Sequence, residues 1–374
     1  MSKTVCILRS NPVRPDSRVE KEAYSLSKNG YDVHIFAWDR DCDHPPVNEF
    51  IEVVDKKIPI TRLGCKATFG EGFKNIIPYL KFQLGIRRFL KRNRFDVVHA
   101  CDFDTAFFSQ GVVRRKKEKF VFDIFDFLAG DPKNLFQRII KKLQIRLINR
   151  SDAAIICTEE RRKQIAESRP KRLYVIHNTP MTAQLPLCKE AKPASDAGRI
   201  SVSYVGILQD YRLLPELVSF FSRRPDLEWH VGGFGKYEEL FKRAAAENEN
   251  IHFYGRISYE DTLKLESRCD INLAIYDPEV ENHRYAAPNK FYESLMLGKP
   301  VIMVKNTGMA NVVSQNDIGE VIEYSEKGFE EGLYRLIAKR DEWSKMSAEM
   351  KHIYDTEYNW SIMEQRLSEL YSTL

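Results

Sequence analysis

The sequence predicts an α/β protein built from two doubly wound, parallel-sheet domains. Short apolar segments typical of buried strands alternate with amphipathic helical segments along the whole 374-residue chain. Between two such series, residues 181–198 are rich in Pro, Ala, Lys and Glu, which is typical of a linker. We therefore expect one domain over residues 1–180 and a second over residues 199–355.

Length and composition are those of a globular protein. The chain can bury two cores, and 43% of its residues are hydrophobic. No run of about 18 apolar residues occurs, so no transmembrane helix is expected, and residues 1–8 indicate a strand rather than a signal peptide. The seven cysteines are scattered without a Cys-x-x-Cys pair. We expect reduced thiols, a cytoplasmic location and no structural zinc site.

Charge is divided unevenly between the two expected domains. Residues 1–180 contain 35 Lys and Arg against 22 Asp and Glu, a net charge of +13. Residues 181–374 contain 23 against 31, a net charge of −8. A basic domain favours an anionic partner, such as a membrane lipid, a lipid phosphate or a nucleic acid. Nucleic acid is the least expected of these, because aromatic residues are not interleaved with the basic ones.

The chain opens with the strand, loop, helix and strand of a doubly wound sheet. Thr4–Arg9 and residues 31–37 are the expected strands, and the helix between them ends near Lys28. Ligands bind at the carboxyl ends of strands in such sheets, so the loop Asn11–Arg18 is expected to face a ligand. Arg18, near the helix N-terminus, is a candidate phosphate contact or else a solvated surface arginine.

A second strand end carries polar residues. Residues 95–100 form an expected strand with His99 close to its end, and Asp102 and Asp104 follow the strand. Such side chains point toward the ligand edge of a parallel sheet, although a histidine there is as often structural as functional. Asp102-Phe103-Asp104 also fits an Asp-x-Asp metal-binding pattern, which is a weak signal at three residues.

Two basic amphipathic helices are expected in the first domain, at residues 79–94 and 134–150. The second has an apolar face that includes Leu135, Ile139, Leu143 and Leu147. Its opposite side carries Arg138, Lys141, Lys142, Arg146 and Arg150. One interpretation is a surface helix packed on a sheet. The other is a helix that lies on an anionic membrane leaflet.

The second domain repeats the alternation of strands and helices. Ile200–Val205 is an expected strand that leads into Gly206 and, further on, Arg212. Residues 228–231 form another strand, and the glycine-rich turn Gly232–Gly235 after it would let the backbone approach a ligand closely. Further strands are expected at residues 251–254, 270–276 and 301–304.

The most informative stretch is residues 286–301. Pro288 fits the first position of a helix, and Gly298 fits its C-cap. Asn289 and Lys290 lie in the first turn, where free N–H groups and the helix dipole favour an anion. Glu293, one turn later, could accept hydrogen bonds from vicinal hydroxyls. A capped helix with a solvated lysine and glutamate is the alternative interpretation.

Pro288–Glu293, followed by Gly298–Ile302, resembles the donor-site signature of the retaining glycosyltransferases of family 4. These have the GT-B fold, in which two Rossmann-like domains face each other across a cleft. The resemblance implies that Glu293 binds the ribose of a nucleotide. The common signature has an earlier glutamate, separated from the second by seven residues. Tyr285 stands at that position here.

Weaker resemblance extends over nearly the whole chain and implies roles for further residues. Asn11, His99 and Asp102 are expected on the acceptor side, and His99, Arg212 and Lys290 are the expected catalytic residues. The expected donor-binding residues are Arg18, Gly206, Arg212, Gly233, Arg256, Ile257, Asn289, Lys290 and Glu293. Ile207 replaces a basic residue of the family pattern. Residues 356–374 resemble the terminal helix that crosses back to the first domain.

The resemblance implies a retaining transferase that moves a sugar from a nucleoside-diphosphate sugar to a glycan or polyprenyl-linked acceptor, without a metal or other cofactor. We expect a role in cell-envelope polysaccharide biosynthesis, and a cytoplasmic protein that attaches to the inner face of the cell membrane. Three alternatives stay open. The first is a nucleotide-sugar 2-epimerase of the same architecture, and the second is a metal-dependent transferase that uses Asp102 and Asp104. The third, and the least expected, is a non-enzymatic module that binds nucleic acid through the basic first domain.

Overall fold

The computed structural model describes residues 2–67, 75–181 and 198–374 of the chain. These residues divide into two compact units. The first unit contains Met1–Asn178 together with Met363–Leu374, and the second contains Thr179–Ile362. The expected linker, residues 181–198, lies almost wholly outside the described residues.

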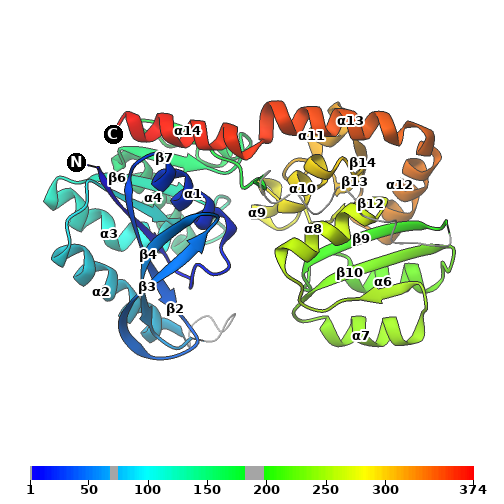
Figure 1. Ribbon diagram of the computed structural model, residues 1–374, viewed down its shortest axis with the longest axis horizontal. Coiled ribbons are helices and arrows are strands. Elements are labelled where there is room, and N and C mark those ends of the chain that lie inside the picture. The colour runs from blue at the N-terminus through cyan, green and yellow to red at the C-terminus, as the bar shows by residue number, and fades with distance from the viewer. Residues whose placement is uncertain (1, 68–74, 182–197) are drawn as a thin grey trace. The chain divides into compact units, whose positions relative to one another are not determined.

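A doubly wound sheet forms the centre of the first unit (Figure 1). Among the described residues it has eight strands in the order β3-β4-β2-β1-β5-β6-β7-β8. The strands are β1 (Thr4–Arg9), β2 (Asp32–Asp39), β3 (His44–Val53), β4 (Lys56–Gly64), β5 (Val97–Cys101), β6 (Lys119–Ile124), β7 (Ala153–Ile156) and β8 (Leu173–Val175). Only β3 and β4 pair in an antiparallel manner within this described sheet. The parallel order agrees with the predicted α/β class.

Helices of the first unit bury their apolar sides on this sheet. They are α1 (Ser17–Lys28), α2 (Ile76–Arg92), α3 (Asp102–Lys116), α4 (Leu135–Arg150), α5 (Arg161–Gln164) and α14 (Trp360–Ser372). Phe82 and Ile86 of α2, Val113 of α3 and Ile148 of α4 share one core with side chains of the central strands. Burial of each such side chain stabilises the fold by about 1.5–3 kcal/mol.

The hairpin of β3 and β4 was not predicted from the sequence. Within β3 only Ile51 and Val53 are buried, whereas Phe50 is 67% exposed. An edge strand with so few buried positions lacks the apolar run by which strands are recognised.

The second unit is also built on a parallel sheet. Its six described strands have the order β11-β10-β9-β12-β13-β14. They are β9 (Ile200–Ile207), β10 (Leu227–Phe234), β11 (Ile251–Phe253), β12 (Ile271–Ala274), β13 (Val301–Val304) and β14 (Gly319–Ile322). Because β10 continues to Phe234, Gly232 and Gly233 belong to the strand, which corrects the expectation of a turn directly after residue 231.

Helices cover both faces of this second sheet (Figure 1). The α-helices are α6 (Leu214–Ser222), α7 (Glu238–Glu247), α8 (Tyr259–Arg268), α9 (Glu281–Arg284), α10 (Asn289–Leu297), α11 (Ala310–Gln315), α12 (Glu326–Ala338) and α13 (Trp343–Ile353), with the short helices η3 (Arg340–Glu342) and η4 (Tyr354–Tyr358). One core contains Phe221, Trp229 and Phe329, and another contains Phe291 and Leu295 of α10. The second core fixes α10, the helix of the 286–301 motif.

The terminal helix α14 packs on the first unit, beside α1 in Figure 1. The Tyr371 hydroxyl lies 2.9 Å from His99 Nδ1, and its ring meets the Tyr31 ring edge-on at 5.3 Å. Glu364 forms an ion pair of 2.9 Å with Lys28 of α1. The last helix is therefore an integral part of the first unit.

Apolar side chains are exposed on α2 and on the first half of α4. Those between 45% and 73% exposed are Ile76, Ile77, Leu80, Leu84, Leu135, Phe136 and Ile139. Only the second half of α4 is buried, through Leu147 and Ile148. The expected apolar face of α4 is thus buried at Leu147 but exposed at Leu135 and Ile139. Across the described segments, no helix is both long and apolar enough to span a bilayer.

Candidate functional site

Two cations meet at the carboxyl edge of the second unit's sheet. Arg212 follows β9, and Lys290 lies in the first turn of α10. The Arg212 guanidinium carbon is 4.1 Å from the ring centroid of Tyr276, and Lys290 Nζ is 5.9 Å from the same centroid. Each side chain is only 9% exposed. Within the described residues neither cation forms an ion pair with a carboxylate, so both charges are left available to an anion.

A histidine that the sequence analysis missed orients Arg212. The carbonyl of Asp277 lies 2.8 Å from His283 Nδ1 and can only accept a hydrogen bond, so this nitrogen carries the proton. His283 Nε2 then accepts a hydrogen bond of 3.0 Å from Arg212. The Tyr211 carbonyl accepts a second one, of 2.9 Å. No sequence motif marks His283, because its role depends on the fold of the loop after β12.

Lys290 is buried among aromatic rings and remains charged. Its Nζ lies 4.8 Å from the ring centroid of Tyr204. Burial acts to lower the pKa of the Lys290 ammonium, but the neighbouring acidic groups, Tyr276 first among them, outweigh it, and the pKa is raised. The side chain is therefore a full positive charge at the N-terminus of α10, where the helix dipole favours an anion as well.

Gly206 and Gly233 bring two strand ends and Lys290 into close contact. The two glycines are register partners on β9 and β10. A Cβ atom on Gly233 would lie 1.9 Å from the Gly206 carbonyl oxygen, and one on Gly206 would lie 2.7 Å from Lys290 Nζ. Both positions therefore require glycine for steric reasons.

The loop after β11 lies against the end of β10. The Arg256 guanidinium carbon is 4.7 Å from the ring centroid of Phe234. A Cβ atom on Gly232 would lie 2.8 Å from Ile257 Cδ1. The structure thus gathers Gly233, Arg256 and Ile257, all expected from the sequence, at one end of the sheet.

The remaining expected residues of α10 differ in accessibility. Asn289, the first residue of the helix, is exposed, whereas Glu293 is 3% exposed and lies beside Tyr259 and Glu266. Burial and then the charge of Glu293 raise the pKa of Glu266 well above its usual range. Tyr285, in place of the earlier glutamate, ends the short helix α9. The roles of Asn289 and Glu293 stay predictions.

Arg18 is buried inside the first unit, so the alternative of a solvated surface arginine is wrong. It is 3% exposed. Its guanidinium donates to Asp123 at 2.6 Å, to Glu22 at 3.1 Å and to the Ile176 carbonyl at 3.0 Å. Its N–H groups are thus directed at these partners, and a phosphate contact by Arg18 stays a prediction. The sequence predicts a helix start near Arg18, but it does not show that the carboxylates of Asp123 and Glu22 lie beside the guanidinium.

His99 is also buried. It lies inside β5, whereas the sequence placed it at the strand end, and it is 0% exposed. One ring nitrogen lies 2.9 Å from the Tyr371 hydroxyl, and the other lies 3.3 Å from Asp123 Oδ2. The expected catalytic and acceptor-side role of His99 stays a prediction. The contacts of His99 fix α14 to the central sheet.

Asn11 shapes the loop between β1 and α1. Its amide donates to Asp16 at 2.8 Å, and its carbonyl oxygen accepts from the Val13 backbone at 2.8 Å. Arg9, which the sequence analysis missed, donates to the same Asp16 oxygen at 2.7 Å. Asn11 therefore uses its side chain to hold its own loop, and an acceptor contact by it stays a prediction.

Asp102 completes this network at the start of α3. One carboxylate oxygen pairs with Arg9 at 2.5 Å. The other accepts from the backbone N–H groups of Phe125 at 3.0 Å and Asp126 at 3.1 Å. Burial raises the pKa of Asp102 to about 6, although Arg9 acts in the opposite direction. Because both oxygens are engaged, the geometry does not favour a metal bound by Asp102 and Asp104.

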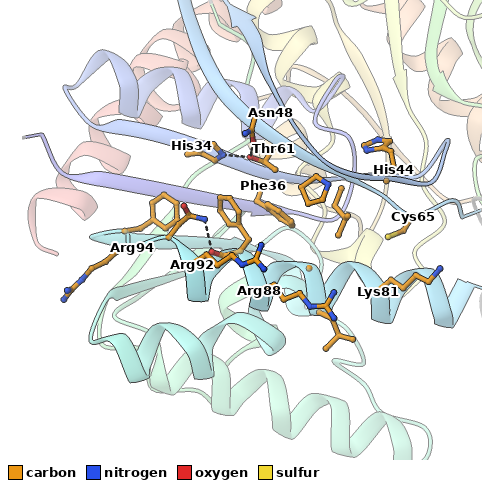
Figure 2. Close-up of a pocket in the computed structure, with 18 of the residues that line it drawn as sticks. His34, Phe36, His44, Asn48, Thr61, Cys65, Lys81, Arg88, Arg92 and Arg94 are labelled. Carbon is orange, nitrogen blue, oxygen red and sulfur yellow. Dashed lines mark hydrogen bonds between the residues drawn. The ribbon is translucent and has the colours of Figure 1, made fainter.

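A cavity of about 1220 Å³ lies elsewhere in the first unit, between α2 and strands β2 and β4 (Figure 2). Lys81, Arg88 and Arg92 of α2 line it, together with Phe36 of β2 and Thr61 of β4. None of the residues that the sequence predicts for catalysis lines this cavity.

Comparison with protein families gives two matches. Residues 18–179 match the profile of Glycosyltransferase Family 4, and residues 189–352 match that of Glycosyl transferases group 1. One relative is the GDP-mannose-dependent monoacylated alpha-(1-6)-phosphatidylinositol monomannoside mannosyltransferase of Corynebacterium glutamicum, 24% identical over 174 residues. The match covers 42% of this chain and 42% of the relative, so it spans less than half of either protein.

Two solved structures resemble the whole chain. Sucrose-phosphate synthase from Thermosynechococcus elongatus is 13% identical with a TM-score of 0.79, over 99% of this chain and 98% of that one. HepE of Anabaena, in complex with UDP and glucose, is 13% identical with a TM-score of 0.71, over 100% of each chain. At such identities the likeness shows the fold, and it confirms the predicted GT-B fold.

Proposed function

Because the chain belongs to the family of group 1 glycosyl transferases, we propose that it transfers a sugar from a nucleoside-diphosphate sugar to a glycan or lipid-linked acceptor, with retention of configuration. The observation that carries this proposal is the pair of buried cations, Arg212 and Lys290, which lack a carboxylate partner among the described residues. The names of the relatives support the donor class, since one is GDP-mannose-dependent and the other was solved with UDP and glucose.

The two cations suit a diphosphate leaving group. When the bond to the sugar breaks, negative charge grows on the phosphate oxygen. Lys290, Arg212 and the N–H groups at the start of α10 would stabilise that charge without having to reorganise, because His283 and the surrounding rings already fix them. We propose that the diphosphate departs from the same face of the sugar that the acceptor attacks, and that the leaving phosphate removes the acceptor proton.

The nucleoside would lie along the ends of β9 and β10. Gly206 and Gly233 keep this edge free of side chains, and Arg256 with Ile257 would border the base. Glu293 would accept the ribose hydroxyls. Glu293 is only 3% exposed, so its carboxylate would have to become accessible when a nucleotide binds. No bound metal is part of this proposal.

Nucleotide binding and product analysis test the proposal. We expect UDP or GDP, and the matching nucleotide sugar, to raise the melting temperature, because a ligand that binds only the folded chain stabilises it by about 2.7 kcal/mol at 100 times its Kd. Glu293→Gln should weaken this effect, and exposed Glu330→Gln serves as a control. NMR of the product should show the anomeric configuration of the donor. A product that is an epimerised nucleotide sugar, formed without acceptor, would exclude a transferase.

We further propose that the first unit attaches to an anionic membrane at the inner face of the cell, where the enzyme would serve cell-envelope polysaccharide synthesis. The exposed apolar residues of α4, such as Leu135 and Phe136, lie within about two helical turns of Arg138 and Lys142. Such a surface can insert apolar groups between lipids while each cation adds about 1 kcal/mol of attraction. The cations of the α2 cavity, including Arg88, would add to the same attraction.

Sedimentation with vesicles tests the attachment. Binding should require anionic lipid and weaken with salt. It should fall when the α4 cations Arg138, Lys141, Lys142 and Arg146 become Glu. A control with the same change of charge replaces Arg114, Arg115, Lys117 and Lys119, near the end of α3, and should bind better than the α4 variant. Equal recovery in the supernatant with anionic and neutral vesicles at low salt would refute the attachment.

A further inference from the structure

Three side chains with metal-ligand chemistry face one another at the β10–β11 edge of the second unit. Glu228 and His230 lie two residues apart on β10, so their side chains point to the same face of the sheet. His252 of β11 is the register partner of His230. Glu228 is near the start of β10, whereas Gly233 is near its end, so this cluster is separate from the candidate donor edge.

The ligand atoms are already close together. Glu228 Oε2 lies 3.4 Å from His230 Nε2 and 4.0 Å from His252 Nε2, and all three atoms lie within 4.8 Å of one another. With metal–ligand bonds of about 2.0–2.1 Å, ligands of a tetrahedral zinc site are about 3.4 Å apart. Small side-chain rotations would therefore complete the geometry.

His230 has a buried nitrogen directed at this point. The side chain is 3% exposed, and its Nε2 forms no hydrogen bond with any described residue. Its Nδ1 is 2.8 Å from the hydroxyl of Tyr254, which can hold the ring in place and fix its tautomer.

The charged groups around the three ligands favour one kind of ion. Arg199 pairs with Glu228 Oε1 at 3.1 Å, which leaves Oε2 directed at the two imidazoles. Arg268 lies near His230 as well. With two arginines and one carboxylate nearby, a hard oxygen-seeking cation such as Ca²⁺ or Mg²⁺ is disfavoured, whereas two imidazole nitrogens favour zinc.

We propose that Glu228, His230 and His252 bind one zinc ion, with water as the fourth ligand on the side of His252. The His252 side chain is 37% exposed and gives the ion a route of entry. The ion would join the edge strand β11 to β10 and so stabilise the second unit. The zinc site lies at one end of the sheet, and Arg212 and Lys290 lie at the other. The zinc proposal is therefore independent of the proposed transferase function.

A second cluster in the first unit supplies a matched control. Asp39, Cys42 and His44 also offer three ligand atoms within 4.8 Å. Here, however, the Asp39 carboxylate already accepts hydrogen bonds from the Asp41 backbone at 2.9 Å and bonds to His44 at 3.0 Å. No atom of this cluster is among the buried, unsatisfied atoms of the described chain. A thiolate ligand would also give a distinct spectrum, so the two clusters can be separated.

The experiment uses the full chain, freed of metal with a chelator and then titrated with zinc sulfate. We expect one zinc per chain and a higher melting temperature. His252→Ala should weaken zinc binding by at least about 10-fold, and because His252 is partly exposed the variant should still fold, which circular dichroism checks. His230→Gln tests the buried ligand. Cys42→Ser and the exposed His352→Ala are the controls and should bind zinc as the unaltered chain does.

Cobalt substitution gives an independent reading. Tetrahedral Co²⁺ bound by Glu228, His230 and His252 should absorb in the visible range without the charge-transfer band of a thiolate ligand. Loss of binding in His252→Ala with retention in Cys42→Ser supports the proposal. Loss in Cys42→Ser with retention in His252→Ala, a thiolate band, or no stoichiometric zinc binding would overturn it.

Discussion

In the first unit Arg18 is bound by the carboxylates of Asp123 and Glu22, whereas in the second unit Arg212 and Lys290 lie on the rings of Tyr276 and Tyr204. A carboxylate neutralises a buried cation. An aromatic face attracts it through the ring quadrupole but leaves the net charge in place. The first arrangement therefore joins parts of a domain, while the second holds positive charge ready for an anion.

The same contrast applies to histidines. His99 links Asp123 to Tyr371 in a closed network, and each ring nitrogen has a partner inside the first unit. His283 instead accepts a hydrogen bond from Arg212 and so positions a cation whose charge no carboxylate of the described residues neutralises. In these examples the polar groups of the first unit bond to one another, whereas those of the second unit remain available to a ligand.

The largest expected effect tests the closed network of the first unit. Asp123→Ala leaves the buried Arg18 without its main partner, and removing one member of a buried ion pair typically costs about 3–5 kcal/mol. Denaturant unfolding should show this loss. Asp126→Ala, whose side chain is 65% exposed, is the control and should cost little. If Asp123→Ala and Asp126→Ala have the same free energy of unfolding, the ion pairs of Arg18 do not stabilise the first unit.

Replacing the available cations tests the second unit. Lys290→Ala and Arg212→Ala should each lower turnover roughly 10²–10³-fold, or about 2.7–4 kcal/mol, with little loss of stability. The Michaelis constant should change less, because charge builds up in the transition state. Lys305→Ala, an exposed lysine paired with Glu323, is the control. Turnover at the level of the unaltered chain in both variants would show that these cations do not assist departure of the diphosphate.

Tyr371→Phe separates a structural His99 from a catalytic one. The change removes the hydroxyl that lies 2.9 Å from His99 Nδ1 and leaves that nitrogen buried without a partner. We expect a loss of about 1–3 kcal/mol in the free energy of unfolding and no change in nucleotide affinity. Tyr31→Phe keeps the neighbouring ring and should have a smaller effect. A selective fall in turnover, with stability intact, would return His99 to the active site.

The last prediction concerns the pH dependence of stability that Asp102 confers. Its pKa is about 6 in the folded chain, against about 3.8 in the unfolded one. Between these values the folded chain binds more protons, so this contribution to stability is present at low pH and is lost as pH rises from about 4 to about 6. Asp102→Asn should lack this part of the pH dependence. Parallel curves of unfolding free energy against pH for the two proteins would show that Asp102 has an ordinary pKa.

The sequence placed α10 well, because its helix signals are local. Phe291 and Leu295 are one helical turn apart, and the C-cap Gly298 follows Leu295 by three residues. No distant contact is therefore needed to interpret these signals. The resemblance to family 4 then named Gly206, Arg212 and Lys290 as donor-binding residues, and the structure brings Arg212 and Lys290 to the ring of Tyr276. The β3–β4 hairpin was missed because its burial depends on neighbours rather than on its own pattern.

The sequence by itself determined the order of strands and helices and the division of charge, since both are properties of consecutive residues. Only the tertiary structure decided which charges stay available. Asp123 lies 105 positions from Arg18, and Tyr371 lies 272 positions from His99. Whether a cation meets a carboxylate or an aromatic ring depends on side chains that folding brings together from such separations. This choice leaves Arg212 and Lys290 of the second unit, unlike Arg18 of the first, without a carboxylate partner among the described residues.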